Sequence, residues 1–359
     1  MPGINYQDEL SNRLDAQAEK IINTLPIFAA KFFDFIMLEK GFSSRTTLQY
    51  AYDLRMFFDY IQASAGFKDT NIRTLTASDI FDKLTHEDIQ EYLKTISYYE
   101  KTDPKTNKAY KVKASNATRA RRISSLRSFM NYYFKEKDIS NNLASLMELP
   151  KMKDKDIVVL DKDEIQRLLS AVIDIDGLTP GQLKRHEKII DRDRAILMVL
   201  LGTGIRVSEL VGINCDDIDF IGHTIRVVRK GGDVDYVPVG SSVLGALDEY
   251  RNGARNILLL PDVEKDAFFL SMQHKRLSVA SVEKLVEAYA RKANINKPIT
   301  PHSCRKSFGT MLYEKYGDIY LVAESLHHSS VETTRKHYAK MSSAHKSKIA
   351  DAAEEMLNE

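Results

Sequence analysis

The chain has 359 residues, of which 43% are hydrophobic and 28% charged, and its formal net charge at pH 7 is +2. This composition is typical of a globular protein long enough for two domains with separate cores, and it excludes wholesale disorder. The longest apolar runs, such as residues 195–202, fall short of the ~20 residues of a membrane span, and the acidic first 24 residues do not resemble a signal peptide. We therefore expect a cytoplasmic protein without a membrane partner.

The positive charge is concentrated in one stretch of the chain. Residues 101–137 contain 11 Lys and Arg against 2 Asp and Glu, whereas residues 1–100 contain 10 against 15. A basic cluster of this kind suits the neutralisation of nucleic-acid phosphates, although a solvated lysine-rich loop accounts well for residues 101–113 alone. Cys215 and Cys304 have neither the number of a disulfide framework nor the spacing of a zinc site, so we expect two free thiols.

The first 150 residues have mainly the apolar periodicity of helices. Residues 1–26 form a predicted helical extension that ends at Pro26 and packs either on the neighbouring domain or on another subunit. Further helices are predicted at 28–36, from Ser43 or Ser44 as N-cap to residue 61, at 84–99 behind a capping pair of Thr85 and Asp88, and at 115–135. The polar segment 100–114 has no apolar period and predicts a loop or a short turn.

Residues 150–156 are charged and lack apolar anchors, which is the composition of a linker between domains. Behind it, a helix is predicted from Asp161, with Glu164 at the capping-box position, and a buried helix at 191–201 that breaks at two glycines and restarts behind Arg206. Strand-like runs at 224–228 and 236–239 flank Gly-Gly-Asp and predict a β-hairpin. The last residues, 341–359, have the apolar face of a short tail helix.

Several side chains in the second half of the chain suit chemistry on a phosphodiester. The planar fork of arginine matches the phosphate oxygens, whose charge grows in the transition state, so Arg206 and Arg305 are a candidate clamp. His302 and His328 could donate hydrogen bonds or move a proton near neutral pH, and Tyr338 is a candidate nucleophile. Taken singly, each of them is more often a surface or packing residue.

As a set, and in this order, these residues resemble the catalytic constellation of the tyrosine recombinases, the phage-integrase and Xer-like family. The resemblance implies an all-α, SAM-like core-binding domain over 27–149, followed by a mainly helical α+β catalytic domain over 157–340 with a small hairpin. It also implies site-specific DNA cleavage and rejoining through a 3′-phosphotyrosyl intermediate, with strand exchange between two DNA sites in a homotetramer. Six residues match the catalytic positions: Arg206, Lys230, His302, Arg305, His328 and Tyr338.

The same resemblance assigns supporting roles. Lys230 would protonate the departing 5′ oxygen, with Arg229 as the competing candidate, and Glu209 would orient Arg206. The residues implied to face double-stranded DNA are Thr46, Gln49, Tyr50, Arg119 and Arg122. No cofactor is implied, and accessory DNA-bending or directionality proteins and docking of the tail on a neighbouring subunit are further expectations.

The chain departs from the family pattern at three positions. Cys304 stands where leucine is common, Lys306 where histidine often occurs, and His327 where glycine is usual, which leaves open whether His327 or His328 faces the phosphate. A zinc site among the histidines and Cys304 has no recognised ligand spacing, so no metal is expected. The alternatives are a type IB topoisomerase and a catalytically inactive DNA-binding regulator, and the sequence separates neither integration from resolution or inversion nor one target site from another.

Overall fold

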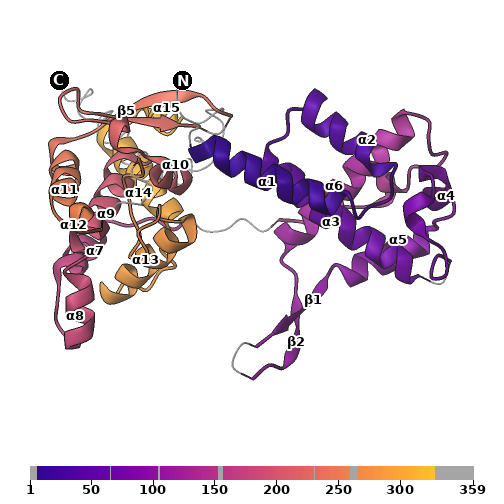
Figure 1. The fold of residues 1–359 in the computed structure, drawn as a ribbon, viewed down its shortest axis with the longest axis horizontal. Coiled ribbons are helices and arrows are strands. Elements are labelled where there is room, and N and C mark those ends of the chain that lie inside the picture. The colour runs from indigo at the N-terminus through magenta and orange to yellow at the C-terminus, as the bar shows by residue number, and fades with distance from the viewer. Residues whose placement is uncertain are drawn as a thin grey trace, which may run out of the picture. The chain divides into compact units, whose positions relative to one another are not determined.

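The computed structural model describes residues 6–64, 66–103, 106–152, 157–229, 231–258 and 266–327. The chain forms two compact units, residues 1–154 and 155–359, and the division falls in the charged segment 150–156 (Figure 1). The second unit carries the candidate catalytic residues, and the first carries the basic stretch 101–137.

The first unit is built mainly from helices: α1 (Tyr6–Ile22), α2 (Ala29–Asp34) with a π-helical turn (Phe35–Glu39), α3 (Ser44–Ala63), α4 (Ala77–Phe81), α5 (His86–Thr95) and α6 (Asn116–Lys135). Short 3-10 turns lie at Ile72–Thr74 and Leu143–Leu146. Thr85 and Asp88 form the predicted reciprocal capping box, and Ser43 is the N-cap of α3. The Thr85–Asp88 hydrogen bonds satisfy backbone groups that a helix start leaves unpaired, which explains why α5 begins there.

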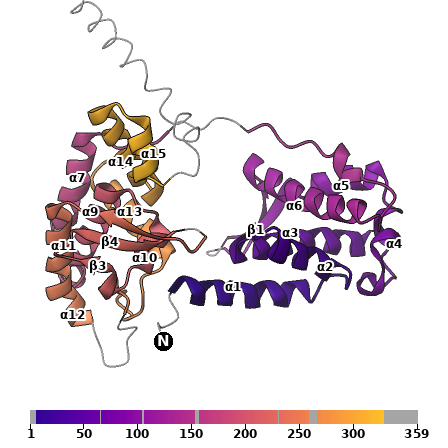
Figure 2. The same ribbon diagram turned by 90° about the horizontal axis from the view of Figure 1, so that it is seen from above.

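The core of the first unit is aromatic. Phe32, Phe57, Phe81 and Phe129 are fully buried, and their rings make edge-to-face, tilted and stacked contacts, such as the 4.9 Å centroid distance between Phe32 and Phe129. Helix α1 packs against α3 and contributes Ala18 and Ile21 to the same core (Figure 2). Of the two interpretations left open, the N-terminal helix therefore packs on its own unit.

The prediction of a loop over residues 100–114 is wrong. Strands β1 (Tyr98–Thr102) and β2 (Ala109–Lys113) form an antiparallel hairpin between α5 and α6, with Glu100 opposite Lys111 and Thr102 opposite Ala109. Four of the five residues of β2 are exposed, so neither face is covered and no alternation of apolar and polar residues could reveal the strand. At the base of the hairpin, between β2 and α6, the backbone N–H of Ala114 donates to the carbonyl of Ser97 at 2.8 Å.

The second unit is helical around a small antiparallel sheet with the strand order β3–β4–β5. Its strands are β3 (Ile218–Asp219), β4 (Thr224–Val228) and β5 (Val234–Pro238), so the predicted hairpin is confirmed. Its helices are α7 (Lys162–Ile173), α8 (Pro180–His186), α9 (Ile190–Thr203), α10 (Val207–Gly212), α11 (Ser241–Asn252), α12 (Ala254–Leu258), α13 (Val279–Lys292), α14 (Pro301–Tyr316) and α15 (Ile319–Ser325).

Helix α9 lies at the centre of the second unit. Most of its side chains from Ala195 to Leu201 are fully buried, as its near-continuous apolar sequence predicted, and it packs against α7, α11 and α14. Asp161 caps α7 and forms the predicted capping box with Glu164. The two-domain, mainly helical fold class is thereby confirmed, with the β1–β2 hairpin as an addition to the first unit.

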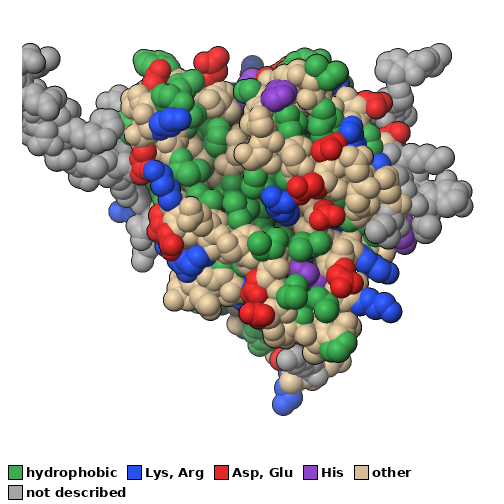
Figure 3. Space-filling view, turned by 90° about the vertical axis from the view of Figure 1, so that its left-hand side faces the viewer, with side chains coloured by type: hydrophobic (Ala, Val, Ile, Leu, Met, Phe, Trp, Pro, Cys, Tyr) green, Lys and Arg blue, Asp and Glu red, His purple; other side chains and the backbone are tan. Residues whose placement is uncertain are grey.

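No helix among the described residues is long and apolar enough to cross a membrane. On the face of the second unit that carries α7, α8, α11 and α12, charges of both signs are interspersed with apolar side chains (Figure 3). A surface that follows a DNA backbone is expected to carry mainly Lys and Arg, so this face lacks the charge pattern of a phosphate-binding surface.

Candidate active site

The backbone turn between α9 and α10 leads into Arg206 and accepts a hydrogen bond from Arg305. Helix α9 ends at Thr203, and Gly204 adopts the left-handed conformation, with φ +63°, that reverses the chain. A side chain on Gly204 would collide with the ring of Phe308, because a Cβ built there lies 2.5 Å from Phe308 Cδ1. Only Gly204 breaks the helix; Gly202, the other predicted breaker, lies inside α9.

Arg206 leaves this turn as the N-cap residue of α10. Its backbone N–H and its Nη1 donate to the two carboxylate oxygens of Glu209, at 2.7 and 2.8 Å. The Arg206 side chain is 37% exposed, whereas that of Glu209 is 2% exposed. Glu209 therefore holds the guanidinium through Nη1 and leaves part of it open to solvent, where a phosphate could bind.

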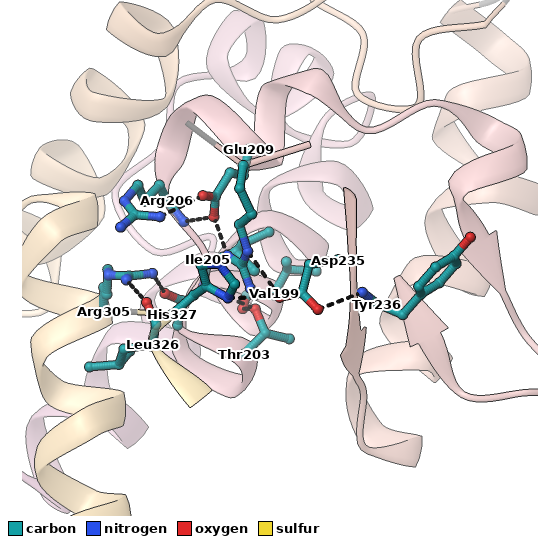
Figure 4. A network of polar contacts seen from close by, with 12 residues as sticks. Val199, Thr203, Ile205, Arg206, Glu209, Asp235, Tyr236, Arg305, Leu326 and His327 are labelled. Atoms are coloured by element: carbon teal, nitrogen blue, oxygen red, sulfur yellow. Dashed lines mark hydrogen bonds and ion pairs between the residues drawn. The ribbon is translucent and has the colours of Figure 1, made fainter. Parts of the chain in front are cut away.

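Arg305, on α14, reaches the same turn from the other side. Its Nη1 donates to the carbonyl of Gly204 at 2.6 Å, and its Nη2 donates to the carbonyl of Leu326 (Figure 4). The residue is 4% exposed, so its charge is kept where the local dielectric is low and an anion would be attracted strongly. One of the two carbonyls that hold Arg305, that of Gly204, thus lies only two residues before Arg206 in the chain.

Arg229, the competing candidate for the hairpin cation, is buried and fixed. Its side chain is 3% exposed, and its Nη1 donates to Glu209 at 2.8 Å while its Nε and Nη2 donate to Asp235 at 3.1 and 2.7 Å. Burial works to raise the pKa of Asp235, but the hydrogen bonds and charge of Arg229 outweigh it and the pKa lies below its ordinary value. Two carboxylates occupy Arg229, so Lys230 remains the candidate acid.

Two histidines near the candidate site, His302 and His327, have different surroundings. His302 is exposed on the first turn of α14, which Thr300 caps, one turn before Arg305. His327 has a positive φ of 46°, in the region that favours glycine, which accounts for the glycine usual in the resembled family. Its Nδ1 lies 3.6 Å from Asp235 Oδ2, so His327 faces the β4–β5 hairpin.

Three of the six candidate catalytic residues, Lys230, His328 and Tyr338, lie outside the described residues, as do the predicted tail helix 341–359 and part of the linker. The structure brings together Arg206, Glu209 and Arg305. Of the two thiols, Cys304 is fully buried, which raises its pKa to about 12, and both cysteines are free as predicted. Within the described part of the chain, no three His, Cys, Asp or Glu side chains are grouped to hold a metal.

The residues expected to face DNA lie on α3 and α6 of the first unit. Thr46 is partly exposed and shares a 2.9 Å hydrogen bond with Ser43, and Arg122 donates to the carbonyl of Ile96 at 2.9 Å. Arg119 is half-buried, and its Nε has no hydrogen-bond partner among the described residues. Tyr50 packs inward, with its ring stacked 6.3 Å from that of Phe32, and burial raises its pKa.

A network between α3 and α6 was not predicted. Arg121 forms an ion pair with Asp53, whose side chain is 2% exposed, and Ser125 donates to the same carboxylate at 3.3 Å. With its amide oriented to satisfy both atoms, Gln49 accepts from Arg121 at 2.7 Å. Arg121 therefore fixes one expected DNA contact, Gln49, to the core, and no local sequence pattern indicates a pairing across 68 positions.

Two profiles match the chain, one in each unit. Residues 29–137 match the Phage integrase N-terminal SAM-like domain, and residues 158–345 match the Phage integrase family. The tyrosine recombinase XerD of Staphylococcus haemolyticus is 33% identical over 305 residues, which cover 85% of this chain and 91% of that protein. XerD of Oceanobacillus iheyensis is 32% identical over 304 residues, covering 85% and 90%.

Solved structures share the fold at lower identity. The XerH site-specific recombinase bound to its palindromic difH substrate, in a post-cleavage complex, has a TM-score of 0.61 and 20% identity, covering 93% of each chain. The Tn1549 transposon integrase in complex with transposon right end DNA also has a TM-score of 0.61, with 18% identity and coverage of 90% of this chain and 100% of that one. From its motifs, its two profile matches and its XerD relatives, the chain belongs to the phage integrase family and is a site-specific tyrosine recombinase.

Proposed function

We propose that this recombinase cuts and rejoins double-stranded DNA through a covalent 3′-phosphotyrosyl link on Tyr338, and exchanges strands between two sites through a Holliday junction. The observation that carries the proposal is the anchoring of Arg206 and Arg305 to one turn. Two guanidinium groups held by a buried carboxylate and by backbone carbonyls are preorganised, so they need not rearrange as charge develops on a bound phosphate.

In the proposed reaction, the phenolic oxygen of Tyr338 attacks the scissile phosphorus and forms an O–P bond. The bond between phosphorus and the 5′ oxygen breaks, and Lys230 supplies the proton that the 5′ oxygen takes up. Arg206 and Arg305 stabilise the charge on the non-bridging oxygens, and His302 and His328 donate hydrogen bonds to the phosphate or accept the phenol proton. Attack by a 5′-hydroxyl on the phosphotyrosine reverses these steps and rejoins the strand.

The first unit is proposed to hold the duplex through residues of α3 and α6. Thr46, Gln49, Arg119 and Arg122 are the proposed contacts, and their helices are fixed by the Arg121–Asp53 pair. Tyr50 is partly buried against the core and would act mainly by positioning its neighbours on α3. The DNA complexes of XerH and of the Tn1549 integrase support the same mode of binding here, and four subunits on two sites, with the tail 341–359 docked on a neighbour, complete the proposal.

The test uses duplexes that trap the cleaved state. A site is first selected from a randomised DNA pool by binding to the protein, and it is then nicked so that a short cleavage product diffuses away. We expect wild type to form a covalent adduct and to leave a free 5′-hydroxyl that polynucleotide kinase labels directly. Tyr338→Phe should form no adduct, while the matched control Tyr320→Phe, a 71% exposed tyrosine on α15, should behave as wild type.

Two results would contradict the proposal. An adduct that persists in Tyr338→Phe would identify a different nucleophile, and the absence of an adduct on DNA that wild type binds would favour the regulator. A two-site assay, in which each duplex carries a different label, then separates strand exchange from the relaxation of a supercoiled circle by a type IB topoisomerase.

A further inference from the structure

A buried arginine at the base of a two-stranded turn needs an explanation. Arg229 follows the last residue of β4, Val228, and precedes Lys230, a place where a cationic side chain is ordinarily solvated, yet its side chain is 3% exposed. Replacing a buried ion pair by apolar side chains is often neutral or stabilising, so stability alone is a weak reason for such a pair. What the pair fixes in space is a better guide to its role.

The Nη1 atom of the Arg229 guanidinium reaches the carboxylate that holds Arg206. Glu209 Oε2 accepts from Arg229 Nη1 at 2.8 Å and from the backbone N–H of Arg206 at 2.7 Å, while Oε1 accepts from Arg206 Nη1 at 2.8 Å. The side chain of Glu209 is only 2% exposed, so water has little access to replace either partner. A movement of Arg229 must therefore move or unpair the carboxylate that orients Arg206.

The Nε and Nη2 edge of the same guanidinium ties the two strands of the hairpin together. Asp235 on β5 accepts from Nε and Nη2 of Arg229, and the backbone N–H of Arg229 donates to the carbonyl of Asp233 at 2.7 Å. The backbone between these two contacts contains Lys230. The Arg229–Asp235 pair thus ties the residue that precedes Lys230 to the neighbouring strand β5.

Asp235 also contacts a third segment of the chain. His327 Nδ1 lies 3.6 Å from Asp235 Oδ2, and the next residue in sequence is His328 (Figure 4). Asp235 keeps its negative charge at neutral pH, because its pKa lies below the ordinary value despite partial burial. Arg206, Lys230 and His328 are therefore each bonded to, or adjacent in sequence to, one chain of four side chains: Glu209, Arg229, Asp235 and His327.

We infer that Arg229 and Asp235 are positioning residues that fix the β4–β5 turn, and with it Lys230, to the carboxylate that orients Arg206. The inference rests on the proposed function, in which Lys230 protonates the leaving 5′ oxygen. Asp235 is the more informative of the two residues for a test. Asp235→Asn keeps the size of the side chain and removes the charge that pairs with Arg229, whereas truncating Arg229 would take from the buried Glu209 one of its two arginine partners.

The experiment compares two leaving groups in single-turnover cleavage by the full chain. One nicked duplex has the ordinary 5′ bridging oxygen at the scissile phosphate, and the other has sulfur at that atom. A thiolate leaves without being protonated, so the sulfur duplex does not require the acid. A well-placed general acid contributes roughly 10²–10⁴-fold, so we expect Asp235→Asn to cleave the oxygen duplex at least ~10-fold more slowly than wild type. The sulfur duplex should restore most of this loss.

Two further variants calibrate the measurement. Lys230→Ala should lose more activity on the oxygen duplex than Asp235→Asn and should recover on sulfur. Asp217→Asn removes another ion pair of the same sheet, with Arg226 on β4 at 2.8 Å, which lies outside the chain of four side chains. It should cleave both duplexes at the wild-type rate.

Each other outcome has a definite meaning. Equal loss on the oxygen and sulfur duplexes, or a wild-type rate on oxygen, would overturn the positioning of Lys230 by Asp235. Failure of sulfur to rescue Lys230→Ala would instead remove the acid role assigned to Lys230 in the proposed function, and the inference with it. Formation of the Tyr338 adduct is measured independently, so it would stand or fall on its own.

Discussion

The turn between α9 and α10 should tolerate no side chain at Gly204, and two glycines of the same unit allow the reason to be measured. Gly204 and Gly177 both have positive φ, +63° and +74°, so alanine is strained at either position. A Cβ at Gly204 would lie 2.5 Å from the ring of Phe308, whereas a Cβ at Gly177 meets nothing within 4 Å. Gly177→Ala therefore measures the free-energy cost of the left-handed backbone alone, and Gly204→Ala adds the cost of the collision with Phe308.

The expected magnitudes follow from these two terms. The left-handed conformation costs a residue with a Cβ roughly 1–2 kcal/mol, and forcing an extra carbon into a packed site costs typically about 1–3 kcal/mol. Gly177→Ala should lower the free energy of unfolding by about 1–2 kcal/mol. Gly204→Ala should lower it by about 2–5 kcal/mol, the sum of the two terms.

Urea unfolding of the full chain, followed by circular dichroism at 222 nm, measures both variants through the transition of the second unit. A shift of the midpoint at unchanged slope reports stability alone. DNA cleavage supplies a second measurement, because the Gly204 carbonyl accepts from Arg305 and only Gly204→Ala should slow the reaction. Equal destabilisation by the two variants would refute the argument from the Phe308 contact.

Three further predictions concern other parts of the chain. Wild type should be more stable than Asp235→Asn above pH ~4, and the difference should shrink as the pH falls through the lowered pKa of the folded state, which urea midpoints at several pH values would show. Cys304, with its pKa raised to about 12, should react with a thiol reagent only at the rate of unfolding, whereas the partly exposed Cys215 should react in the native protein; equal rates at pH 8 would contradict this. Replacing Lys108 and Lys111 of the β1–β2 hairpin by Gln should lower the slope of log affinity against log salt by up to ~2, since each phosphate neutralised contributes ~0.9; an unchanged slope would place both lysines away from DNA.

The sequence predicted best those features that depend on neighbouring residues. The capping boxes at Thr85 and Asp161 placed two helix starts correctly, and the β-branched runs around Gly-Gly-Asp predicted the β4–β5 hairpin, because hydrogen bonds and dihedral preferences a few residues apart decide these structures. The β1–β2 hairpin was missed for the opposite reason: its strands are exposed, so no pattern of burial marks them.

Within the site, the sequence identified residues more readily than their contacts. Arg206 and Glu209 could be paired because residues three positions apart at the start of a helix lie close together. The role of Arg229 could not be predicted, since a cation beside a Gly-Gly turn is ordinarily solvated and its two carboxylates come from different elements. The inward packing of Tyr50 likewise depends on Phe32 and Phe42, which approach from other parts of the first unit.

The hydrogen bonds of Arg305 also bear on the order in which the chain folds during its synthesis on the ribosome. Its guanidinium is held by a carbonyl 101 positions earlier in the chain and by another 21 positions later. Chains emerge N-terminus first, at roughly 5–20 residues per second, so the first unit can fold while the arginine still lacks its second support. Under the proposed function, a nascent or truncated polypeptide ending before Leu326 engages DNA through its first unit without an assembled guanidinium pair, so DNA binding is acquired before strand cleavage.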